Sequence, residues 1–162
     1  MSPAWKAAAG AGTSIQWPVG SGEDKNEGVA QRVRTTPDSI GYVEFIYALF
    51  NRLSYAQVRN SAGRFIEADL DSIAAAASNA ENMPASFQLS LTNAAGRKSY
   101  PIAGFTYLLI PARSGDPKKD AFVRELLGWI LTSGQRQAAA LGYGSLPPEI
   151  VEREQKVIAS LQ

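Results

Sequence analysis

The residue types that carry out most protein chemistry are few in this chain. Its 162 residues contain no cysteine and no histidine. Thiolate nucleophiles, disulfides and zinc–thiolate sites are therefore excluded, as are Ser-His-Asp catalysis and histidine-ligated metals. The sequence also lacks a phosphate-binding loop, a dinucleotide fingerprint and a nucleophile elbow. We therefore expect no enzymatic activity, no cofactor and no metal site.

Carboxylates are the remaining candidates for acid–base chemistry. They occur close together at Glu23-Asp24 and again at Asp69 and Asp71. Two carboxyl groups act as an acid–base pair when their surroundings drive the two pKa values apart. Nothing in these polar segments suggests a raised pKa, so we interpret both pairs as solvated groups.

One segment has the form of an anion site, the loop that enters a helix at Asn26-Glu27-Gly28. The start of a helix presents free N–H groups to an anion. Glu23, Asp24 and Glu27 would repel the same anion, so a helix capped by Asn26 is the preferred interpretation. Asn26, Glu27 and Gly28 are kept as weak candidates for a binding site.

The composition is that of an ordinary folded chain, with 45% hydrophobic and 19% charged residues and a net charge of +1. Basic and acidic residues are evenly spread, so neither nucleic-acid binding nor a polybasic membrane anchor is expected. The longest apolar run is too short to span a bilayer. Met1–Lys6 has no apolar signal-peptide core, so the chain as written is not expected to be exported.

Helix signals recur along the first half of the chain. Residues 4–9 predict the end of an alanine-rich helix that stops at Gly10, and Phe45–Phe50 predict a helical turn or two. Asp69 is placed to cap a further helix. Together with several short strand-like segments, these helices indicate an α/β or α+β fold.

The last third of the chain predicts two longer helices. Asp116-Pro117 begins the first of them, with Asp as N-cap and Pro at the first helical position, and Gly134 follows its expected end. The second opens at 146–149. Both helices carry an apolar face, and the three tryptophans are predicted to be core residues. The residues of these apolar faces and the tryptophans are Phe122, Leu126, Trp129, Ile130, Ile150, Val157, Leu161, Trp5 and Trp17.

Three segments have the alternation or composition of strands, namely Thr13–Trp17, Phe87–Leu91 and Tyr100–Ile110. The last is the strongest, because it is aromatic, β-branched and about as long as strands become. A β-hairpin is also predicted over 56–66, with Gly63 supplying a positive φ in its turn.

Several motifs follow one another at a specific spacing over nearly the whole chain. They resemble the C-terminal half of the substrate-binding proteins of phosphate ABC transporters, the periplasmic phosphate-binding proteins. In chain order they are Ser2-Pro3-Ala4-Trp5-Lys6, Gly12-Thr13, Trp17-Pro18-Val19-Gly20, Asn26-Glu27-Gly28-Val29-Ala30, Ile40-Gly41-Tyr42-Val43-Glu44, Tyr100-Pro101-Ile102, Thr106-Tyr107-Leu108-Leu109-Ile110, Thr132-Ser133-Gly134-Gln135 and Leu141-Gly142-Tyr143-Gly144-Ser145-Leu146-Pro147.

The resemblance implies a partial type II periplasmic-binding-protein-like fold of the α/β class. Proteins of that family have two α/β lobes with phosphate bound between them. By the resemblance, residues 1–99 are part of the second lobe, and residues 100–162 supply the crossover strand and C-terminal helices of the first. The helix at 4–9 would then have its first turns upstream of Met1.

The resemblance does not carry over any phosphate ligand. The family's main anion loop, Arg-x-Asp-x-Ser-Gly-Thr, would lie immediately before Met1, and the ligands of the first lobe lie further upstream. The family's Gly-Lys-Gly reads Glu23-Asp24-Lys25 here, which puts two carboxylates near the expected rim of the cleft. This departure leaves only the weak candidates at Asn26, Glu27 and Gly28.

Two functional hypotheses follow from the resemblance. In the first, the chain is a phosphate-binding component of an ABC-type uptake system, or a fragment of one, located outside the cytoplasmic membrane with a membrane phosphate permease as partner. In the second, it is a non-binding remnant or a protein-association module. We further expect self-association through Tyr100–Ile110, because a long uncovered apolar strand recruits another chain. The competing outcome is collapse of both pieces into one compact unit.

Overall fold

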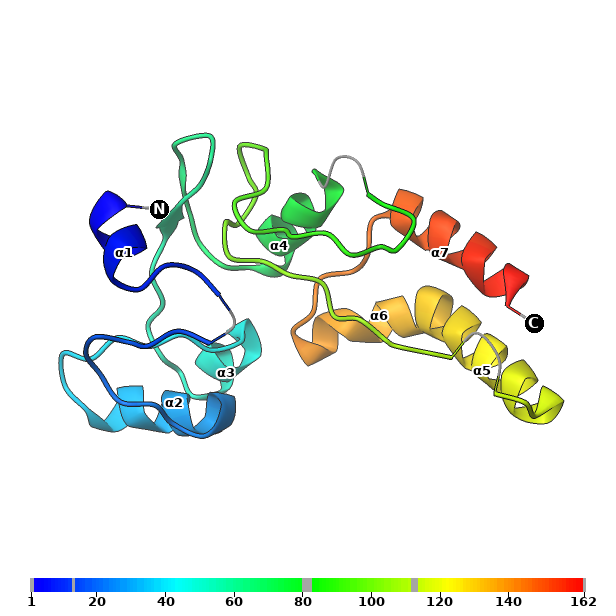
Figure 1. Ribbon diagram of the computed structural model, residues 1–162, viewed down its shortest axis with the longest axis horizontal. Coiled ribbons are helices and arrows are strands. Elements are labelled where there is room, and N and C mark those ends of the chain that lie inside the picture. Colours follow the sequence, from blue (N-terminus) through cyan, green and yellow to red (C-terminus); the bar gives the residue numbers. More distant parts are fainter. Residues whose placement is uncertain (1, 13, 80–82, 112–113, 162) are drawn as a thin grey trace.

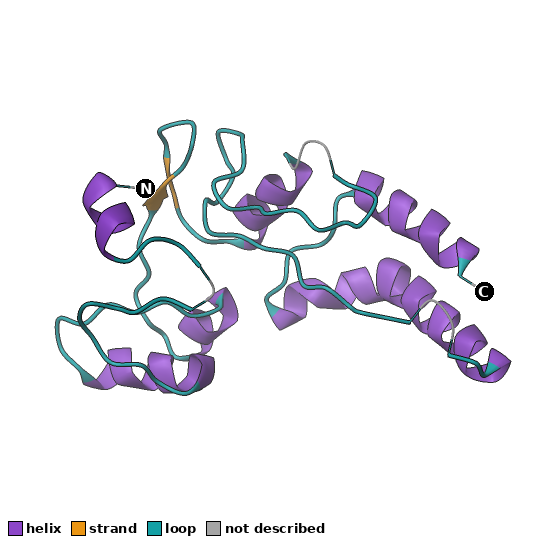
Figure 2. Cartoon of the chain, in the orientation of Figure 1, coloured by secondary structure: helices purple, strands orange, loops and turns teal. Residues whose placement is uncertain are grey.

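The computed structural model describes residues 2–12, 14–79, 83–111 and 114–161. Along the longest axis the elements lie in two groups, with the N-terminal helices and a hairpin on one side and the remaining helices on the other (Figure 1). Most of the regular structure is helical (Figure 2). In chain order the elements are α1 (Pro3–Ala8), α2 (Lys25–Thr35), α3 (Phe45–Phe50), β1 (Val58–Arg59), β2 (Phe65–Ile66), α4 (Leu70–Ser78), α5 (Pro117–Trp129), α6 (Gln135–Ala138) and α7 (Pro148–Ser160).

The predicted helix starts at Asp69 and Asp116 are confirmed. The expectation that the helix at 4–9 has its first turns upstream of Met1 is wrong, because α1 begins at Pro3 and the Ser2 side chain accepts a hydrogen bond from the Trp5 N–H at 3.1 Å. The end of α1 before Gly10, which has a φ of 72°, agrees with the prediction. Asp69 caps α4 by accepting from the Ser72 N–H at 2.6 Å. Asp116 caps α5 in the same manner. Each cap satisfies an N–H group that has no partner inside the helix.

The predicted hairpin is confirmed as well. β1 and β2 are antiparallel, with Val58 opposite Ile66 and Arg59 opposite Phe65. Gly63 has a φ of 75°, a conformation that costs glycine nothing because it has no Cβ. This hairpin is the only sheet among the residues that the structure describes.

The Asn60 side chain joins this hairpin to a distant turn. Asn60 is only 5% exposed. Its Nδ2 donates to the carbonyl oxygens of Gly96, Arg97 and Ser99 at 3.1 to 3.2 Å. Its Oδ1 accepts from the N–H groups of Ala62 and Arg64 at 3.1 and 3.0 Å, so both ends of the amide are satisfied.

The same turn is attached to α4. The Ser99 side chain is fully buried, and its hydroxyl donates to the carbonyl oxygens of Ala95 and Ala75. The Tyr100 N–H donates to the Ser72 carbonyl at 3.0 Å. Hairpin, turn and α4 thus form one unit that is held by buried polar groups.

The three other predicted strands are not formed in the described residues. Thr13 lies outside the described residues, and 14–17, Phe87–Leu91 and Tyr100–Ile110 belong to no sheet. Phe87 has a φ of 57°, which is outside the strand region. A strand exists only when a neighbour takes its backbone hydrogen bonds. The backbone groups of Leu89 are hydrogen-bonded by a side chain instead of a neighbouring strand. The Tyr107 hydroxyl accepts from the Leu89 N–H and donates to the Leu89 carbonyl, both at 3.2 Å. The α/β prediction is therefore confirmed for the helices and the hairpin alone.

The expected end of the helix at Gly134 is wrong. α5 continues through a π-helical turn at Ile130–Gly134 into α6 and a 3₁₀ turn at Ala139–Leu141. Within this π-helical turn the Gln135 side chain donates to the Ile130 carbonyl at 3.1 Å. Gly142, with a φ of 80°, ends the whole helical stretch.

Five of the nine buried apolar residues are alanines, and many large apolar side chains lie at the surface. Trp17 and Trp129 are 56% and 52% exposed, so their prediction as core residues is wrong, whereas Trp5 is half-buried. Phe122 and Leu126, on the predicted apolar face of α5, are also exposed. No helix in the described part of the chain is long and apolar enough to cross a membrane. The buried apolar residues are Ala30, Ala48, Ala68, Ala76, Ala77, Leu91, Leu127, Leu131 and Ile150.

We predict that Asn60→Ala lowers the free energy of unfolding by about 3 kcal/mol, because it leaves several buried backbone groups without partners. The midpoint of urea denaturation measures this loss. The control is Ser61→Ala in the same turn, which removes one exposed hydrogen bond to the Ala94 carbonyl and costs about 1 kcal/mol or less. Equal losses for the two variants would contradict the organising role of Asn60.

Candidate functional site

Asn26, Glu27 and Gly28, the weak candidates for a binding site, lie at the start of α2. Asp24, not Asn26, occupies the N-cap position, so the expected capping by Asn26 is wrong. Asn26 lies in the first helical turn, and its amide points to the segment before α3 instead. Its Oδ1 accepts from the Glu44 N–H at 2.9 Å, and its Nδ2 donates to Glu44 Oε1 at 3.3 Å. Asn26 therefore caps α3 from a distance, since Glu44 is the N-cap residue of that helix.

The two neighbours of Asn26 are engaged as well. Glu27 accepts a hydrogen bond from the Tyr47 hydroxyl at 3.2 Å. This bond and the negative charge of Glu27 raise the pKa of Tyr47. The Gly28 N–H donates to the Asp24 carbonyl at 3.1 Å, and a Cβ on Gly28 would lie 3.2 Å from the Cβ of Glu23. The structure thus brings the three candidates together, with their polar groups directed at protein partners.

The charge around the start of α2 is negative. Glu23 forms an ion pair with Arg32, with Oε1 and Nε 2.6 Å apart. The hydrogen bond from Arg32 holds the pKa of Glu23 below its usual range, and burial opposes this shift. Glu44 accepts a further hydrogen bond from the Tyr143 hydroxyl at 3.3 Å. Chemically, this arrangement connects α2, α3 and the loop after α6.

Two arginine side chains elsewhere in the described residues, those of Arg124 and Arg153, are also engaged with protein groups. One shallow cavity between the segment after Ile110 and α5 includes Arg124, which donates to the Leu161 carbonyl at 3.0 Å. In the same cavity Asp120 accepts from the Ser114 N–H at 2.9 Å. Hydrogen bonding from the Ser114 side chain, and then from its backbone, lowers the pKa of Asp120. A second cavity beside α7 includes Arg153, which donates to the Pro84 carbonyl at 3.3 Å and lies over the Phe87 ring.

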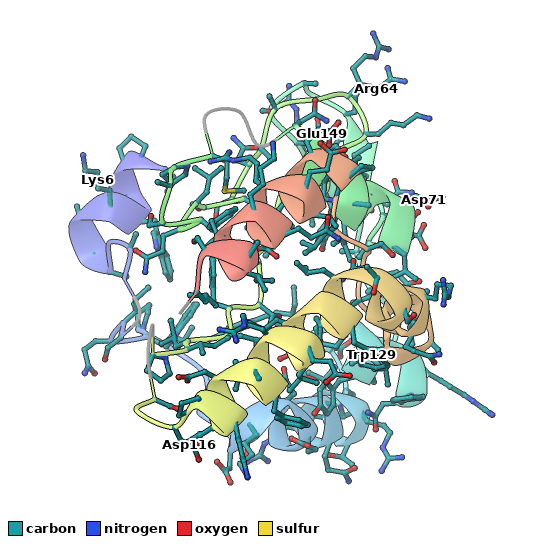
Figure 3. The ribbon with its side chains drawn as sticks, turned by 90° about the vertical axis from the view of Figure 1, so that its right-hand side faces the viewer. Lys6, Arg64, Asp71, Asp116, Trp129 and Glu149 are labelled. Carbon is teal, nitrogen blue, oxygen red and sulfur yellow. The ribbon has the colours of Figure 1, made fainter. Side chains whose placement is uncertain are left out.

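The charged side chains that Figure 3 labels lie on separate elements and do not converge on one point. No group of acidic residues suited to hold a metal ion occurs within the described ranges. Sequence reasoning missed Asn60 and Gln135 as organising residues. An Asn before Ser61-Ala62-Gly63 is a turn signal that could have identified Asn60, whereas no local signal marks Gln135.

Comparison with known proteins gives a consistent result. No protein-family model matches the chain. The chain is 41% identical over 161 residues to the phosphate-binding protein PstS of Xylella fastidiosa, covering 99% of this chain and 44% of that protein. It is 38% identical to PstS of Haemophilus influenzae, over 93% of this chain and 46% of the relative. It is 30% identical to PstS of Methanocaldococcus jannaschii, over 94% and 43%.

The chain is thus a homologue of phosphate-binding proteins, and the resemblance predicted from its motifs is confirmed. Within that class its relatives are the PstS proteins. The chain spans less than half the length of these relatives. The homology implies a periplasmic-binding-protein-like fold, and the mostly helical chain with its two-stranded hairpin is a partial version of it. The names of the relatives describe binding proteins, not enzymes.

We predict that Arg32→Gln raises the pKa of Glu23 toward its ordinary range, as measured by NMR titration of the carboxyl group. The folded-state pKa of Glu23 lies below the unfolded value. The ion pair therefore contributes stability above the unfolded pKa, and this contribution is lost as the pH falls through the folded pKa. Arg34→Gln is the control, because Arg34 hydrogen-bonds Gln31 instead. A Glu23 titration that Arg32→Gln leaves unchanged would contradict the assignment.

Proposed function

We propose that the chain is part of the substrate-binding component of an ABC-type phosphate uptake system. The observation that carries this proposal is 41% identity to a phosphate-binding protein over 99% of the chain. In this proposal residues 1–99 are part of the second lobe of a type II periplasmic-binding-protein-like α/β fold. Residues 100–162 then form the crossover segment and the C-terminal helices of the first lobe.

We further propose that these residues alone bind phosphate weakly or not at all. Phosphate sites need convergent N–H donors, hydroxyl groups and an arginine fork. The resemblance placed none of the family's ligand motifs on this sequence, and the candidate residues at the start of α2 are surrounded by carboxylates. In support, Arg32, Arg124 and Arg153 are each engaged with protein groups.

The proposal also assigns a ligand, a membrane partner and a cellular location to the complete protein. Inorganic phosphate is its ligand, a phosphate permease in the membrane is its partner, and its location is periplasmic or extracytoplasmic. These properties derive from the homology to proteins named as phosphate-binding proteins.

A hybrid protein tests the proposed function. The homologous stretch of the Xylella fastidiosa relative is replaced by this chain, and phosphate binding is measured by titration calorimetry. We expect one-to-one phosphate binding of micromolar affinity or better by the hybrid and none at that level by the chain alone. A neutral sugar is the control ligand. A folded hybrid that does not bind phosphate, or micromolar binding by the chain alone, would refute the corresponding proposal.

The alternative function is a non-binding remnant or association module that keeps only the structural half. The exposure of large apolar side chains favours it, because surfaces of this kind are rarely left uncovered on a monomer. Under this alternative the hybrid would fold without binding phosphate, so the same titration separates the two functions.

We also propose that the chain self-associates through Tyr100–Ile110. Sedimentation at tens of micromolar is expected to show a dimer, and Leu109→Lys is expected to shift it to monomer because it places a charge on an apolar interface. Ile40→Lys is the matched control, since Ile40 is 94% and Leu109 90% exposed but the two lie on different parts of the chain. A stable monomer of the unmodified chain would contradict self-association.

A further inference from the structure

The chain exposes far more surface than its size requires. Its accessible surface is 11862 Å² for a mass of 17.4 kDa. A compact folded monomer of this mass exposes about 7,900 Å². The excess is about 4,000 Å², whereas each partner in a standard stable interface buries about 800 Å². The area available is therefore several times what a stable dimer needs.

Part of this excess lies on a segment whose backbone has no partner. Among the described residues, no N–H or carbonyl group from Ile102 to Ile110 takes part in a backbone hydrogen bond, and 103–110 belong to no helix, strand or turn. The side chains of Ile102, Leu108 and Leu109 are exposed beside it. An uncharged segment with the composition of a strand and free backbone groups is a template for pairing with another strand.

Two prolines define the length of this template. Pro101 and Pro111 stand at its ends, and neither can donate a backbone hydrogen bond. When two copies of Ile102–Ile110 are placed antiparallel, only a register centred on Thr106 sets Pro101 opposite Pro111. In that register all the backbone N–H groups of 102–110 lie within the paired region. Any shift of this register brings a proline into the paired region and loses hydrogen bonds.

The side chains are self-complementary in that register. Thr106 faces its own copy, and threonine pairs form favourable cross-strand contacts. Phe105 lies opposite Tyr107, which pairs aromatic rings, and Gly104 lies opposite Leu108, which pairs a small residue with a large one. The remaining opposed pairs are Ala103 with Leu109 and Ile102 with Ile110. No charged residue occurs in the segment, so no like charges meet across the axis.

We propose that a second copy of this chain occupies the exposed segment, with Ile102–Ile110 of both copies paired antiparallel about a two-fold axis at Thr106. This inference rests on the proposed self-association and adds its register. The occupant is a second copy because the segment is complementary to itself in length, volume and charge. A two-fold pair of this kind closes on itself and leaves no edge for a third chain at the same site.

Single cysteine variants test the register, because the natural chain contains no cysteine. Residues directly opposite in an antiparallel pair have Cα atoms about 4.5–5.5 Å apart, which suits a disulfide. We therefore expect Thr106→Cys to form a disulfide-linked dimer under mild oxidation. Ile102→Cys is the matched control, because in the proposed register the two copies of residue 102 are about 27 Å apart.

A mixture supplies the second readout. Ala103→Cys and Leu109→Cys are expected to cross-link when mixed and to remain unlinked when each is oxidised alone. Cross-linking of Ile102→Cys as efficiently as Thr106→Cys would indicate in-register stacking or non-specific association and would overturn the register. A variant that sediments as a dimer without forming the Thr106→Cys disulfide would overturn the register but not self-association. Sedimentation of the unmodified chain as a monomer would overturn both.

Discussion

The amide of Asn60 is the interaction on which the centre of this structure depends. One buried side chain satisfies three carbonyl groups of the turn at 96–99 and two N–H groups of the hairpin loop. Through Ser99 and Tyr100 the same turn is fixed to α4. Buried polar groups stabilise only when every partner is present, so these contacts specify one arrangement of three segments that share few large side chains. Five of the nine buried apolar residues are alanines, and each of these buries little apolar surface.

Local signals in the sequence predicted the elements that need no distant partner. Helix starts at Asp69 and Asp116 depend on a side chain three or fewer residues away, and the hairpin depends on its own turn. The predicted strands failed for the opposite reason. Tyr100–Ile110 has the composition of a strand, but strand formation requires a second backbone, which the described residues do not provide. Gly134 was mistaken for a helix stop because a π-helical turn leaves no mark in hydrophobic periodicity.

The candidate site was predictable in position but not in detail. The loop at Asn26-Glu27-Gly28 does enter a helix, yet Asn26 turns to Glu44, eighteen residues further along the chain. The contact between Glu44 and Tyr143 joins residues that are even further apart in the sequence. Such contacts depend on how the chain returns on itself, which single-residue preferences do not encode. The family motifs carried this information instead, because they preserve the order of segments that the homologous phosphate-binding proteins share.

The alanine core affects how stability responds to temperature. The heat-capacity change of unfolding grows with the apolar surface that becomes hydrated, about 12–15 cal/mol/K per residue for ordinary domains. A chain whose buried apolar residues are few and include five alanines, and which already exposes Trp17 and Trp129, hydrates less new apolar surface when it unfolds. Its stability curve is correspondingly shallow, with a broad thermal transition and weak cold destabilisation. Covering the exposed apolar residues with another polypeptide would increase the heat-capacity change of unfolding. Calorimetry therefore measures how completely the apolar surface is covered, without the need for a bound ligand.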